Sequence, residues 1–164
     1  MKNVASIQTF MILLARQTEL INLLEQRQRE LQGLVEERKW EAMEQLVPTM
    51  TALSESVSRV EEERDSLFQE IALSLGHPGD LAGILSALPP DVRAGISRGY
   101  RDLKIAVLRL QSATAVFDSY MRSNLATGRS ILRELFPEHT SGGYARDGQG
   151  RFSSAPAMMV DQQL

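Results

Sequence analysis

Apolar residues recur at heptad spacing along most of this chain, and this pattern constrains the fold more than any other feature. Two polar residues, Gln17 and Gln28, interrupt the first stretch. Its seam positions hold Ile7, Leu14, Ile21 and Val35 on one line, and Phe10, Leu24 and Leu31 on the other. A heptad repeat places an apolar stripe along an α-helix, which the helix buries against a neighbour. The pattern therefore predicts long, packed helices.

The same spacing returns in two further stretches. The second stretch carries Met43, Met50, Val57 and Ile71, with Leu46, Leu53, Val60 and Leu67. The last carries Ile96, Leu103, Leu110, Phe117 and Ile131, with Tyr100, Val107, Met121 and Leu135. Aromatic residues make up only 5% of the chain, and Leu, Glu, Gln, Arg, Ala and Ser dominate it, a composition that favours helices over sheets.

The position of the first turn has two interpretations. Pro48 costs about 3 kcal/mol inside a helix, which argues for a break there. Two antiparallel helices of matched length would instead turn near Arg38-Lys39-Trp40. We favour the turn at residues 38–40, with Pro48 kinking the second helix.

The clearest break in the chain is the segment Gly76-His-Pro-Gly-Asp80. Asp80 can cap a short helix over residues 81–88, and the two prolines that follow end this helix and start the next. The last helix is expected over residues 91–136, where Pro137 stops it.

These boundaries predict an all-α fold. We expect an extended antiparallel helical hairpin or bundle with coiled-coil-like packing, built from three long helices and one short helix. Residues 1–137 would form this helical body. Residues 138–164 are rich in Gly, Ser, Pro and Gln and are expected to be a disordered C-terminal tail.

The helices carry more apolar residues than one buried stripe requires. The first helix has a second line at Leu13, Leu20, Leu23 and Leu34. These additional apolar residues have two interpretations. They could belong to a wider core or a self-association surface, or they could line a groove for a partner helix. Asn124, followed by Gly128, fits helix packing better than partner contact. The candidate groove residues are Ile105, Leu108, Val116, Tyr120 and Asn124.

Nothing in the sequence indicates catalysis, a cofactor or a metal. The chain has no Cys, and His77 and His139 lack the helical spacing of a metal site. The net charge of −3, with interspersed signs, indicates neither nucleic acid nor anionic lipid as a partner, and Glu61–Arg64 is interpreted as a solvated face. The apolar run over residues 10–15 is far shorter than the roughly 20 residues of a membrane span, and no cleavage site follows it. We expect a cytoplasmic protein that is not an enzyme.

The chain resembles the FlgN family of flagellar export chaperones over most of its length. The resemblance rests on Trp40-Glu-Ala-Met-Glu-Gln-Leu46 leading to Glu61–Arg64, and on the ending Tyr144-Ala-Arg-Asp147-Gly148-Gln149. Family members are small, acidic, cysteine-free helical proteins whose chains end in a Tyr, a short spacer and Asp-Gly. Here Ser141-Gly142-Gly143 lengthens the segment before the Tyr.

This resemblance implies a function with two binding surfaces. The helical body would bind the C-terminal amphipathic segments of the hook–filament junction proteins FlgK and FlgL and prevent their premature assembly. The tail would be read by the export-gate protein FlhA, through Tyr144, Asp147 and Gly148. The alternative is a structural coiled-coil homodimer, or a generic helical adaptor with no export role.

Overall fold

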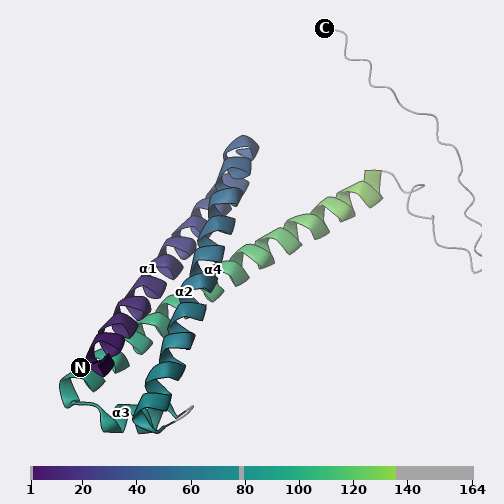
Figure 1. Ribbon diagram of the computed structural model, residues 1–164. Coiled ribbons are helices and arrows are strands. Elements are labelled where there is room, and N and C mark those ends of the chain that lie inside the picture. Colours follow the sequence, from purple (N-terminus) through teal and green to yellow (C-terminus); the bar gives the residue numbers. More distant parts are fainter. Residues whose placement is uncertain (1, 78–79, 136–164) are drawn as a thin grey trace, which may run out of the picture. The chain divides into compact units, whose positions relative to one another are not determined.

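Four helices, and no strand, make up the part of the chain described by the computed structural model, residues 2–77 and 80–135 with side chains from Ala5 onward. They are α1 (Lys2–Glu36), α2 (Trp40–Leu75), α3 (Leu81–Ala87) and α4 (Pro90–Leu135) (Figure 1). The predicted all-α fold, with three long helices and one short helix, is confirmed. Contacts divide the chain into one unit over Met1–Tyr120 and a second over Met121–Leu164, of which residues 121–135 are described.

Helices α1 and α2 form an antiparallel hairpin that turns within residues 37–39 (Figure 1). The Lys39 amide donates to the Leu34 carbonyl at 2.9 Å, and Arg38 takes up the left-handed conformation with φ 57°. The turn near residue 38 is thus confirmed. Pro48 lies inside α2 on an exposed face, where packing along the rest of the helix outweighs the lost backbone hydrogen bond. The kink at Pro48 stays a prediction.

The links around α3 follow the capping signals in the sequence. Gly76, with φ 76°, ends α2 in the left-handed conformation, and the His77 amide donates to the Ala72 carbonyl at 3.0 Å. The Asp80 side chain accepts a hydrogen bond of 3.0 Å from the Ala82 amide and caps α3, as predicted. Pro90 occupies the first position of α4, where its missing N–H costs nothing.

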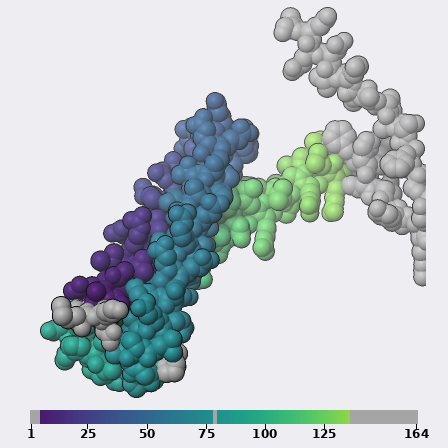
Figure 2. Space-filling view, in the orientation of Figure 1, coloured from purple at the N-terminus to yellow at the C-terminus, as the bar shows by residue number. Residues whose placement is uncertain are grey.

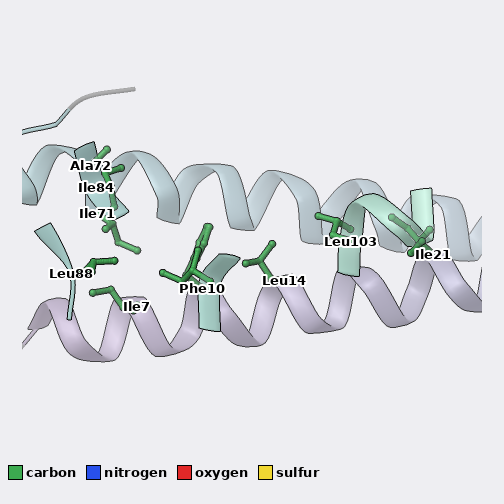
Figure 3. Packing of buried hydrophobic residues seen from close by; sticks show 11 residues of the cluster. Ile7, Phe10, Leu14, Ile21, Ile71, Ala72, Ile84, Leu88 and Leu103 are labelled. Atoms are coloured by element: carbon green, nitrogen blue, oxygen red, sulfur yellow. The ribbon is translucent and has the colours of Figure 1, made fainter. Parts of the chain in front are cut away.

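The core begins near α3 and extends along the first half of α1, from Ile7 to Ile21 (Figure 3). The Phe10 ring centroid lies 6.1 Å from those of both Phe68 and Tyr100, so α1 contacts α2 and α4 through one aromatic cluster. A small cavity with an apolar lining lies within this core, between Phe10, Phe68 and Ile84. The buried cluster contains Ile7, Phe10, Leu14, Ile21, Ile71, Ala72, Ile84, Leu88, Ile96, Leu103 and Ala106.

Two glycines let α4 approach α1 closely. A Cβ added to Gly99 would lie 3.3 Å from Leu14 Cδ1, and one added to Gly95 would lie 3.3 Å from Met11 Cε. Leu14 is 1% exposed and has little room to move. These glycines therefore set how the first turns of α4 are held against the hairpin.

Side chains of α1 and α2 pack along the length of the hairpin (Figure 2), but burial decreases toward its turn. Val35 and Leu46 are buried there, whereas Met43 and Met50 are only half-buried and Trp40 is exposed. The second apolar line of α1 is also largely used, since Leu13, Leu20 and Leu34 are half-buried. Most of the exposed large apolar side chains of the described residues therefore lie on α4.

Candidate partner-binding surface

The last four turns of α4 expose a row of large apolar side chains. We call Met121, Leu125, Ile131, Leu132 and Leu135 the C-terminal stripe. At 3.6 residues per turn these five residues share one side of the helix. Met121 is half-buried, and the other four are 50–66% exposed. Exposed apolar side chains gathered on one helix face are typical of a surface that binds a partner.

The structure departs here from what the heptad pattern predicted. Ile131 and Leu135 were expected in the packed seam, but both are exposed. Asn124 is exposed as well, and no atom lies within 4 Å of a Cβ added to Gly128. The exposure of Asn124 and the open space at Gly128 therefore give no support to the packing interpretation of these two residues.

The candidate groove residues named from sequence fall into two sets. Ile105, Leu108 and Val116 are 41–54% exposed and lie on the side of α4 away from buried Leu103; we call them the outer line. Tyr120 is half-buried and Asn124 is exposed, and at 100° per residue Asn124 lies about 160° around the helix from Leu108. The outer line thus forms a second apolar surface. Tyr120 lies about 40° from Val116 at the edge of this line, and Asn124 lies between Ile131 and Leu135 on the side of the C-terminal stripe.

Sequence reasoning missed Leu125 and Leu132, which are each 58% exposed. The signal was available, because they are spaced by seven residues and lie between Met121 and Leu135 on one helix face. The same periodicity also predicts a buried seam, so the pattern alone does not separate a core face from a recognition face.

A polar cluster joins α1 to α2 beside the core. Arg64 Nη1 donates to Gln17 Oε1 at 2.9 Å, and Arg64 Nη2 lies 2.7 Å from Asp65 Oδ1. Gln17 is 4% exposed, and its side-chain oxygen accepts this hydrogen bond inside the protein. The interpretation of Glu61–Arg64 as a solvated face holds for the three glutamates but is wrong for Arg64, whose side chain is 12% exposed.

Tyr100 of α4 lies close enough to this cluster to sense its charges. Burial raises the pKa of Tyr100, while the Arg64 guanidinium opposes that rise and Asp65 adds to it.

The residues that would contact the export gate, Tyr144, Asp147 and Gly148, lie outside the described residues, as does His139. Among residues 2–77 and 80–135, no group of three His, Cys, Asp or Glu side chains is arranged to hold a metal. In the same ranges, none of the helices has both the length and the apolar character needed to cross a bilayer.

The fold and the exposed faces of α4 define a helical binding protein. The FlgN protein family model matches residues 1–151 of the chain, so the chain belongs to the FlgN family. The family is one of chaperones, and membership makes this chain a flagellar export chaperone in general terms. Comparison with curated proteins and with solved structures found no match.

Proposed function

We propose that this chain is a cytoplasmic export chaperone for the hook–filament junction proteins FlgK and FlgL. The observation that carries the proposal is the exposure of the C-terminal stripe, together with membership of the FlgN family. An amphipathic segment of a junction protein would lay its apolar face along the stripe, as in other helix-in-groove complexes. Binding to the stripe would also cover the apolar face of the substrate segment, and this would prevent premature assembly of the junction protein.

The energetics suit temporary binding. Covering half-exposed Leu and Ile side chains contributes roughly 1 kcal/mol each, since complete burial contributes about 1.5–3 kcal/mol. Ordering a flexible substrate segment opposes this gain. The balance favours a complex that forms in the cytoplasm and dissociates when the substrate enters the export channel.

Delivery would use a separate part of the chain. In this proposal Tyr144 anchors the tail to the cytoplasmic part of FlhA, while Asp147 and Gly148 form a turn that presents the ring. Tyr144 follows the last residue of the C-terminal stripe by nine residues and is no part of it, so in this proposal substrate and gate are bound together. Tyr144→Ala should weaken FlhA binding and leave FlgK and FlgL binding unchanged.

The test uses the full chain with purified C-terminal segments of FlgK and FlgL. One variant changes the C-terminal stripe (Leu125→Ser with Leu132→Ser), and the matched variant changes the outer line (Leu108→Ser with Val116→Ser). We expect the stripe variant to lose at least about tenfold in affinity, because each apolar contact is worth about 1 kcal/mol. The outer-line variant should bind normally.

Two results would overturn the assignment. If only the outer-line variant loses affinity, the substrate surface is the outer line. If neither protein segment binds and sedimentation shows a tight dimer that buries the C-terminal stripe, the chain is a self-associating coiled coil.

A further inference from the structure

Three arginines form a row beside the C-terminal stripe. Arg122, Arg129 and Arg133 are all exposed and, at 100° per residue, lie within about 40° of one another around α4. The only carboxylate in residues 121–135, that of Glu134, lies on the other side of the helix. Three arginines against one glutamate give this segment a net charge of +2, although the whole chain carries −3.

The row differs from the charge pattern of the hairpin. On α1, Arg27 pairs with Glu30 and Arg29 pairs with Glu25 within one turn of helix. By contrast, none of the three arginines of the row has an ion-pair partner within 4.0 Å among residues 2–77 and 80–135. Arg129 and Arg133 are four residues apart and repel each other slightly, whereas Arg133 in the last turn of α4 favours the helix.

We propose that the arginine row selects a partner helix that carries acidic residues along one edge of its apolar face. This inference rests on the proposed function and adds the charge of the partner to it. A helix lying on the C-terminal stripe would bring one of its edges alongside Arg122, Arg129 and Arg133. Glu or Asp at that edge would pair with the guanidinium groups, and Lys or Arg there would be repelled.

A second copy of this chain fits the row poorly. Two copies of this segment that pack through their stripes both carry a net positive charge, so they repel each other.

An anionic membrane also fits less well. Helices that lie on membranes carry cations across their polar face and often aromatic residues at its boundary. Here the cations occupy one flank, the other flank has Thr127, and the C-terminal stripe has no aromatic residue.

The experiment titrates the full chain with three synthetic amphipathic peptides that share one apolar seam. The residues along one edge of the seam are Glu in the first peptide, Gln in the second and Lys in the third. We expect the Glu peptide to bind about fivefold more tightly than the Gln peptide, since two or three exposed ion pairs contribute about 1 kcal/mol. The Lys peptide should bind most weakly, and raising the salt concentration should reduce the differences.

Charge reversal of the row provides the decisive variant. Arg129→Glu with Arg133→Glu should reverse the order, so that the Lys peptide binds most tightly. The matched control is Arg101→Glu with Arg109→Glu, which changes the net charge equally on an exposed part of α4 away from the row and should keep the original order.

The outcomes separate this inference from the proposed function. Equal binding of all three peptides, with normal binding of FlgK and FlgL segments, overturns the charge inference alone. Failure of every peptide and of both protein segments overturns the proposed function and the inference with it. A third outcome is that the chain binds phosphatidylglycerol vesicles through Arg129 and Arg133 and shows no preference among the peptides. This outcome would mean that the arginine row binds lipid, and it would also overturn the inference.

Discussion

Ile96 and Leu132 occupy the same side of α4 but have opposite surroundings. They are 36 residues apart, which is about ten helical turns at 3.6 residues per turn, so both lie on one line of the helix surface. Ile96 is 3% exposed in the core and Leu132 is 58% exposed. Apolar residues on one side of a single helix thus have two surroundings: those of the first part stabilise the fold, and those of the last part are exposed and form the proposed binding surface.

Truncating the side chains of Ile96 and Leu132 tests this difference most directly. We expect Ile96→Ala to lower the free energy of unfolding by about 2–5 kcal/mol, because it removes buried methyl groups and leaves a cavity. Leu132→Ala should change it by no more than about 0.5 kcal/mol, as for other surface substitutions. Urea unfolding followed by circular dichroism measures both. Similar losses for the two variants would mean that Leu132 is packed in solution.

Two glycines of α4 sharpen the comparison. Gly128→Ala meets no atom within 4 Å, so it should favour the helix by about 1 kcal/mol. Gly99→Ala places a methyl group against Leu14, and overpacking of this kind costs about 1–3 kcal/mol, which cancels or exceeds the gain in helix propensity. Hydrogen exchange resolved by segment should show slower exchange around residue 128 and no slowing around residue 99. Equal slowing at both sites would show that α4 does not lie tightly on α1.

The polar cluster offers a third test of the packed half. Arg64→Met should cost about 1–3 kcal/mol, since it leaves the buried Gln17 amide without its partner. Gln17→Leu in the same chain should recover part of that loss, because two apolar groups then replace the pair. A double-mutant cycle on the free energy of unfolding measures the coupling. Additive losses would indicate that the hydrogen bond contributes nothing.

The heptad pattern and the capping residues predicted most of the fold. They identified the four helices, the turn near Arg38 and the Asp80 cap, because these depend on local preferences that the chain itself displays. Gln17 was identified only as an interruption of the seam. Its bond to Arg64 joins residues 47 positions apart, and no local pattern reports such a pair.

The exposed stripe that we propose as the binding surface was harder to predict for the same physical reason. An apolar stripe has the same spacing whether the chain covers it or leaves it for a partner. Ile131 and Leu135 were therefore assigned to the core, and the outer line to the partner. The Tyr144 motif, by contrast, is a short linear signal whose expected role rests on family resemblance, and its assignment to FlhA stays a prediction.

The smallest expected effect concerns Tyr100, in the packed half of α4. Burial raises its pKa above the ordinary value of 10.0, so the folded state holds the phenol proton more tightly than the unfolded state does. The stabilisation is complete below about pH 10 and is lost as the pH rises further through the folded-state pKa. The free energy of unfolding should therefore fall less steeply above pH 10 in Tyr100→Phe than in the unchanged chain. Parallel curves for the two chains would indicate that water reaches the Tyr100 hydroxyl freely and that α4 packs more loosely there than at Ile96.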